Sequence, residues 1–411
     1  MKLITKYLFY LLAFTLPFGS VNPFNLSSIK NVDGISSEQM GITPVLLALC
    51  FFFALLNRDI FRNTSAVKKL LLPLIIFFVT ITMASTFYSL YDFPMVYLLK
   101  LLADIAAFYI LSLFFIRHIN ILDTSLKIYA YTCVLIVLAF FAGFLNSYLF
   151  YSNGRLWIFG INPNNFSFLM GFGALIIADS FNHPNTRKIE QMINIVSIVL
   201  IVIYIIMSGS RGTFLTVLAC MFIVLYKKMK SKFYIIVPIV VICIFASMSF
   251  YYSHQDEISL FERLSEIGDD SRTELIHRTL TLYAEKPIIG YGVNGFNEQL
   301  STRYDDLRDS HNVIITNMGM SGTIGAIAYI AFLFYMFRVC WSNRKRSIFG
   351  LVLFADVFLM SMKTGGVLTF AMMWYAYAAI VAISFVRQRN NHNHIKAKIY
   401  SASKYKRTIV L

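Results

Sequence analysis

Residues 311–337 read HNVIITNMGMSGTIGAIAYIAFLFYMF, a run with no acidic, lysine or arginine residue. A helix of this length is long enough to cross the hydrocarbon core of a membrane. Comparable runs of about 17 to 25 apolar residues recur from end to end of the 411-residue chain, which is 58% hydrophobic. A soluble domain is nearer half apolar, with periodic patterns in place of long runs. The sequence therefore predicts an all-α polytopic membrane protein.

We predict about twelve transmembrane helices. They cover residues 3–20, 41–57, 70–91, 95–116, 126–147, 165–181, 192–209, 212–226, 233–252, 312–337, 349–362 and 366–386. The first run resembles a signal peptide, but no clear small-residue cleavage site follows it, so we expect it to be a retained span. The seventh and eighth spans are divided only at SGSRG, and the short span 349–362 contains Asp356.

Basic residues alternate along the connecting segments and predict the orientation. One set of loops is rich in Lys and Arg: 58–69, 187–188, 227–232, 338–346 and the tail after Arg387. Because Lys and Arg stay on the cytoplasmic side, this set and both termini are expected inside. The chain would then comprise helices 1–9 (1–252), a large periplasmic loop (253–311), helices 10–12 (312–386) and a basic cytoplasmic tail (387–411).

The large loop and the distribution of the net charge of +15 bear on the partners of the protein. Residues 253–311 carry twelve acidic and six basic side chains, and a loop of this length usually has a function. The basic residues are scattered among short loops, so no nucleic-acid partner is implied. The five cysteines, all in or beside apolar runs, are expected to be packing residues: Cys50, Cys133, Cys220, Cys243 and Cys340.

Arginines on the external side are candidates for anion binding. Arg211 lies between two apolar helices with Ser210 and Gly212 beside it, and an ionisable residue at membrane level is costly unless it has a function or a partner. A guanidinium binds phosphate through two parallel hydrogen bonds. Arg155 lies in another external loop, where contact with lipid phosphate is the alternative.

Arg272 lies at a predicted helix start in the large loop. Ser271 and Glu274 have the spacing of a capping box, and the helix should run to about Glu285 before Pro287. An arginine beside a helix N-terminus is typical of an anion site. The alternative is an ordinary ion pair with Asp269 or Asp270. The glycine-rich PIIGYGVNGF that follows predicts a return path of turns.

His311 closes the large loop, where it is either a helix cap or a group that moves a proton. Gly319, Gly322 and Gly325 recur every three residues behind it, so we expect a neighbouring helix to pack against them and to fix the position of His311.

Ionisable residues inside the predicted spans support a different class of function. Lys100 and Asp104 are four residues apart and could pair on one helix face, and Asp179 and Asp356 are also in or near spans. Such residues also mark ion paths, so a transporter remains an alternative.

Four motifs together resemble the O-antigen ligase and polymerase superfamily of bacterial envelope glycosyltransferases. They are His311–Asn312 followed by Gly322 and Gly325, GSRGTFL, SRTELIHRTLTLYAEKPIIGYGVNGF and GRLWIFGINPNNFS. The motif resemblance covers residues 150–325, and the topology of the whole chain is similar. Each motif alone is weak, but four in the family's order on one side of the membrane are fairly specific.

The resemblance implies an O-antigen ligase. Such an enzyme moves a polysaccharide from undecaprenyl pyrophosphate to the lipid A–core of lipopolysaccharide, at the periplasmic face of the inner membrane. It acts as an inverting glycosyltransferase that needs no nucleotide, metal or other cofactor. The alternatives are an O-antigen polymerase, which uses the same donor, and a transporter or flippase of lipid-linked glycan.

The resemblance also implies residue roles. Arg211, Arg155 and Arg272 would bind the pyrophosphate, and His311 would act on the acceptor hydroxyl as a base or an orienting group. The supporting residues would be Asn312, Ser210, Gly322 and Gly325.

Overall fold

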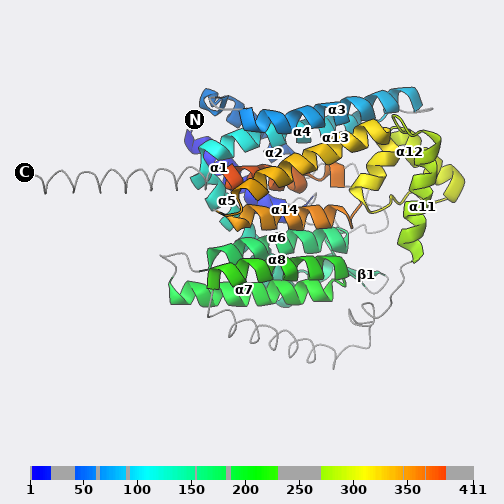
Figure 1. Cartoon of the computed structure of the whole chain (residues 1–411). Coiled ribbons are helices and arrows are strands. Elements are labelled where there is room, and N and C mark those ends of the chain that lie inside the picture. The colour runs from blue at the N-terminus through cyan, green and yellow to red at the C-terminus, as the bar shows by residue number, and fades with distance from the viewer. Residues whose placement is uncertain are drawn as a thin grey trace, which may run out of the picture.

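The computed structural model describes residues 2–19, 42–61, 65–88, 93–152, 155–181, 187–229, 270–345, 347–365 and 367–385. The predicted ninth span (233–252), the first part of the large loop and the basic tail lie outside these residues. The described chain is a bundle of helices with two additional helices and a short hairpin at one end (Figure 1).

The elements follow one another in this order. They are α1 (Lys2–Thr15), η1 (Leu16–Phe18), α2 (Ile42–Leu55), η3 (Arg58–Phe61), α3 (Ser65–Tyr88), α4 (Met95–Arg117), α5 (Ile119–Phe141), η4 (Asn146–Tyr148), β1 (Leu149–Ser152), β2 (Arg155–Ile158), α6 (Pro163–Ser180), α7 (Lys188–Met207), α8 (Arg211–Met229), α11 (Asp270–Glu285), α12 (Val293–Tyr304), α13 (Val313–Asn343), α14 (Ile348–Ser361), η6 (Val367–Thr369) and a last helix, Ala371–Phe385.

Five of the described helices are long and apolar enough to cross a membrane: α3 from Val67, α4, α5, α7 and α13. Four shorter apolar helices accompany them: α1 extended through η1, α2, α14 and Ala371–Phe385. The prediction of an all-α polytopic membrane protein is confirmed at this level. The number of twelve spans stays a prediction.

The helices form two groups joined by α14. Figure 1 shows α3, α4 and α13 on one side and α6, α7 and α8 on the other. The helix α14 packs against both α13 and α8, and so connects the groups. At one end of the bundle lie α11, α12 and the hairpin of β1 and β2.

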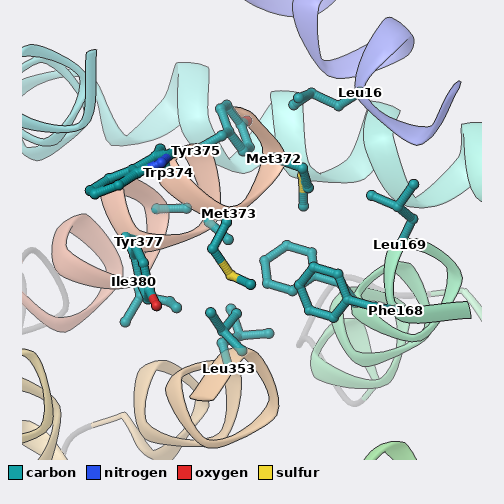
Figure 2. Packing of buried hydrophobic residues seen from close by; sticks show 14 of the residues in the cluster. Leu16, Phe168, Leu169, Leu353, Met372, Met373, Trp374, Tyr375, Tyr377 and Ile380 are labelled. Carbon is teal, nitrogen blue, oxygen red and sulfur yellow. The ribbon is translucent and has the colours of Figure 1, made fainter. Parts of the chain in front are cut away.

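The last helix, Ala371–Phe385, is enclosed by the others. Residues 372–383 are each no more than 2% exposed, and Figure 2 shows their side chains meeting those of α6 and α14. Aromatic rings of α4 and α13 also pack on it: Phe108 against Trp374, and Phe332 against Tyr377. A helix that is apolar on all sides occurs in a protein core or as a membrane span, and this one lies in the interior of the bundle.

Two local features differ from the sequence-based expectation. The predicted loop around Arg155 contains an antiparallel hairpin, in which Ser152 pairs with Arg155. In the sequence the two strands are separated by Asn-Gly, a dipeptide typical of hairpin turns. The fifth span was placed at 126–147, whereas α5 ends at Phe141 because Gly143 turns the chain at a φ of +77°.

The middle glycine of the series in α13 does not have the predicted role of letting a neighbouring helix pack closely. The helix is interrupted at Gly322, whose φ is +61° and ψ is −164°. The segment Pro287–Gly292 from the large loop inserts at this break. The amides of Thr323 and Ile324 donate to the carbonyl oxygens of Pro287 and Ile288, at 2.7 and 3.2 Å.

The inserted segment also donates two hydrogen bonds to α13. The amides of Tyr291 and Gly292 bond to the carbonyl oxygens of Gly319 and Met320, at 3.0 and 2.8 Å. A Cβ on Gly290 would lie 2.6 Å from the Gly322 nitrogen, so the two backbones touch. An interrupted helix is tolerated at membrane depth only when other groups satisfy its backbone. Gly322 therefore accommodates a loop segment in place of the neighbouring helix that the glycine series predicted there.

The other two glycines of the series do lie beside neighbouring helices, α12 at Gly319 and α3 at Gly325, as the series predicted. Gly319 lies against the Phe296 ring of α12, and a Cβ on Gly325 would collide with Ser321 of its own helix. The helix α12 is further fixed to the end of α3, where the Val293 amide donates to the Ser85 hydroxyl at 3.1 Å. The large loop is thus joined to α3 and α13.

We expect Gly322→Ala to destabilise the protein strongly. A Cβ at this position would overlap the backbone of Ile288, and backbone conformations of this kind cost non-glycine residues of order 1–3 kcal/mol. The unfolding temperature in detergent should fall. Gly143→Ala is the matched control, because Gly143 also has a positive φ, but its Cβ would meet only the Asn146 side chain at 3.4 Å. Equal losses in the two variants would contradict this account.

Candidate functional site

A polar cavity of about 250 Å³ brings together the three arginines that the sequence singled out. Arg155 comes from the start of β2, Arg211 from the start of α8, and Arg272 from the first turn of α11. A fourth cation, Lys363, comes from the turn after α14. We call this the cationic cavity. Its charge and its position favour an anionic ligand.

The SGSRG segment builds one wall of the cationic cavity. The helix α7 ends at Met207, Gly209 turns the chain at a φ of +67°, and α8 begins at Arg211. The predicted division between two helices is therefore correct. Ser210 lies beside the first turn of α8, where backbone amides and the helix dipole attract anions.

The NPN segment meets SGSRG in the same wall. Asn162 caps α6 by accepting a hydrogen bond from the Asn164 amide at 2.9 Å. Asn164 in turn accepts a hydrogen bond of 2.9 Å from the Ser210 hydroxyl, which also contacts Thr213 at 2.8 Å. The Asn164 and Ser210 side chains are both buried. Two motifs that are distant in sequence thus form one rigid support for Arg211.

Lys363 explains the glycine of the SRG motif. A Cβ on Gly212 would lie 2.7 Å from the Lys363 Cδ, so the lysine stem crosses the helix at this point. Burial lowers the pKa of Lys363, and the neighbouring Arg272 lowers it further. Sequence reasoning missed Lys363, because a single lysine in a short turn has no distinguishing pattern. Its proximity to three arginines is the signal that only the fold provides.

His311 does not line the cationic cavity, but lies near it beside a carboxylate. Its Nδ1 is 2.8 Å from the Asp309 Oδ1, which also accepts the His311 amide at 2.9 Å. The backbone of His311 has a φ of +52°, and its side chain is 27% exposed. The predictions did not include Asp309, although its position two residues before His311 was visible in the sequence.

The turn after α14 connects the two sets of residues. Lys363 lines the cationic cavity, and a Cβ on Gly365 would lie 2.9 Å from the His311 Nδ1 and 2.5 Å from the Asp309 Oδ1. Asn312 is the N-cap of α13, and its side chain accepts from the amides of Ile314 and Ile315. The position of His311 is therefore fixed from both sides.

The predicted capping box of α11 depends on the Ser271 side chain, which lies outside those that the structure describes. The helix starts at Asp270, one residue before Ser271, and Glu274 accepts hydrogen bonds from Arg278. Arg278 also pairs with Asp306 at 3.2 Å, which ties α11 to the segment after α12. The alternative pairing of Arg272 with Asp269 or Asp270 falls on side chains outside those that the structure describes.

The polar residues within the spans do not include the predicted ion pair between Lys100 and Asp104. Lys100 and Asp104 form no salt bridge in the structure, and the Asp104 Oδ2 is buried without a hydrogen-bond partner in the described chain. Both carboxylate oxygens of Asp356 are in the same situation, and this residue is fully buried in α14. Neither carboxylate lines the cationic cavity.

The fold and site define a multi-pass helical membrane protein with a cationic cavity at one end. Residues 196–330 match the family model described as O-antigen ligase. The matched stretch contains Arg211, Arg272, the inserted segment 287–292 and His311. The resemblance that the motifs indicated is thereby confirmed. A comparison with curated proteins found no match.

We expect inorganic pyrophosphate to bind in the cationic cavity and to raise the unfolding temperature of the purified protein. Arg211→Lys and Lys363→Gln should each weaken this binding about 10- to 100-fold, because charge-assisted hydrogen bonds are lost. Binding is measured by isothermal titration calorimetry. Arg303→Gln is the control, since Arg303 pairs with Glu285 away from the cavity. Unchanged affinity in both cavity variants would exclude this cavity as the anion site.

Proposed function

We propose that the protein is an O-antigen ligase. It transfers O-polysaccharide from undecaprenyl pyrophosphate to the lipid A–core of lipopolysaccharide, at the periplasmic face of the bacterial inner membrane. The observation that carries this proposal is the convergence of Arg155, Arg211, Arg272 and Lys363 on one cavity, with the His311–Asp309 pair across the next turn. The family match over residues 196–330 supports it.

The cationic cavity would hold the pyrophosphate of the donor. In the reaction, the bond between the anomeric carbon and the pyrophosphate oxygen breaks, and the acceptor oxygen bonds to the opposite face of that carbon. The configuration therefore inverts. Negative charge grows on the leaving oxygen, and fixed cations stabilise it most strongly in a site with little water. In this proposal the reaction requires no metal ion, because the three guanidinium groups and the ammonium group supply the positive charge.

His311 would take the proton of the acceptor hydroxyl. A base needs one ring nitrogen without a proton, and the carboxylate of Asp309 favours the tautomer with the proton on Nδ1. The Nε2 atom is then the proton acceptor. The same carboxylate stabilises the imidazolium that forms. This role explains why one oxygen of Asp309 contacts both the ring and the amide of His311.

The placement of these groups supports a reaction on one face of the membrane. Figure 1 shows α11, α12 and the hairpin at the same end of the bundle, and these elements contribute Arg272 and Arg155. The distribution of Lys and Arg among the loops predicts that this end is periplasmic. Both lipid-linked substrates would then reach the site from the membrane, without a nucleotide sugar.

Deletion of the gene distinguishes ligase from polymerase. Loss of a ligase should leave lipopolysaccharide core without O-chain while lipid-linked polymer accumulates. Loss of a polymerase should leave core carrying one repeat unit. The readout is the lipopolysaccharide pattern on a gel, and the control is complementation with the intact gene. Accumulation of lipid-linked glycan on the cytoplasmic side would instead identify a transporter.

Variants of His311 test the catalytic base. Removal of a general base costs roughly 100- to 10,000-fold in rate, so His311→Ala and His311→Gln should both be that slow. The assay uses purified enzyme, lipid-linked donor and core acceptor. High activity in His311→Gln alone would assign an orienting role, and equal rates in all three would leave only a helix cap.

A further inference from the structure

A second cavity lies on the other side of the turn that carries Lys363. Its volume is about 190 Å³. Polar groups from five parts of the fold line it: Tyr97 of α4, Asn297 of α12, Asp309 of the segment before α13, Thr316 of α13 and Thr364 of the turn after α14. The rest of its wall is apolar, with Leu307 among the side chains.

The two cavities share one short segment of chain. Lys363 lines the cationic cavity, and the next residue, Thr364, lines the second one. Gly365 then packs against the His311–Asp309 pair. Asp309 both lines the second cavity and holds the His311 ring at 2.8 Å. His311 itself lines neither cavity, so Asp309 is the link between a group in the second cavity and the His311 ring.

The lining of the second cavity selects a neutral, hydroxyl-bearing ligand. A phosphate would be repelled by Asp309, and no Lys or Arg lines this cavity in the described chain. Hydroxyl, amide and carboxylate groups beside apolar side chains suit a sugar ring, which has polar edges and apolar faces. The volume is smaller than the about 300–1,000 Å³ of pockets for drug-sized ligands, so it fits a single sugar.

We propose that the second cavity binds the terminal sugar of the glycan acceptor and presents its hydroxyl to His311. This inference rests on the proposed function. It assigns the cavity to the acceptor, because the base must lie beside the acceptor hydroxyl, whereas the reacting bond of the donor is held by its pyrophosphate in the cationic cavity. The turn 363–365 then separates donor phosphate from acceptor sugar.

Asn297 is the residue that tests this assignment most directly. Its half-buried side chain lines the cavity and makes no hydrogen bond to another described residue, so it is available to a ligand. The helix that carries it is fixed by other contacts, which include the Val293 amide bond to Ser85 and the ion pair of Arg303 with Glu285. Asn297→Ala should therefore leave the fold intact.

The experiment measures transfer by purified enzyme while acceptor and donor concentrations are varied separately. Both lipid A–core and lipid-linked glycan are offered as acceptors. Asn297→Ala should raise the acceptor KM about 3- to 10-fold, the effect of losing one uncharged hydrogen bond, with an unchanged donor KM. Leu307→Trp, which adds bulk from an exposed position at the cavity wall, should raise the acceptor KM further. Gln299→Ala, on the same helix and outside the cavity lining, is the control.

Each result has a defined meaning. A selective rise in acceptor KM supports the inference for whichever acceptor the enzyme uses. An active wild type with unchanged acceptor KM in both cavity variants overturns the inference alone, and a rise in donor KM would assign the cavity to the donor sugar. A wild type that transfers to neither acceptor contradicts the proposed function, and this inference with it.

Discussion

The four backbone hydrogen bonds between the segment 287–292 and the interrupted helix α13 hold the site together. An interrupted helix exposes amides and carbonyl groups that lipid cannot satisfy. Here the loop satisfies them, and the break at Gly322 in return fixes the loop. Because α11 leads directly into this segment, Arg272 is held against the bundle. The N-terminal part of α13, which begins just after His311, is fixed by the same bonds.

In the cationic cavity, positively charged side chains lie close enough to repel one another. Burial is the main cause of the lowered pKa of Lys363, and the like charge of the neighbouring Arg272 lowers it further. The N-terminus of α8 adds a further positive potential. Neutral hydrogen bonds, such as that from Ser210 to Asn164, hold the wall of the cavity in place. An anionic ligand would relieve the repulsion, which is a physical reason for tight binding of pyrophosphate.

Much of the fold could be predicted from apolar runs, because each long run has one stable solution in lipid. The division at SGSRG and the end of α11 at Glu285 also followed from local residues. The break at Gly322 could not be predicted in this way, because its form depends on the distant segment 287–292. The hairpin around Arg155 was not predicted, although Asn-Gly is a dipeptide typical of hairpin turns. The glycine series of α13 has the spacing of a packing motif, and only the inserted backbone at Gly322 shows its actual role.

Some residues of the site, like the break at Gly322, could not be recognised from the sequence alone. Arg155, Arg211 and Arg272 stand out because charge in an apolar sequence is conspicuous, whereas Lys363 and Asp309 resemble ordinary loop residues until the fold places them. Their positions suggest a division of labour within a short segment. In the turn 363–365, Lys363 lines the cationic cavity and Thr364 lines the second cavity. Gly365 has no side chain and so leaves room for the His311 ring. A larger residue at position 365 would push apart the base and the carboxylate that orients it. In the proposed reaction, this turn would therefore set the distance between leaving group and base, and α14 connects the turn to both halves of the bundle.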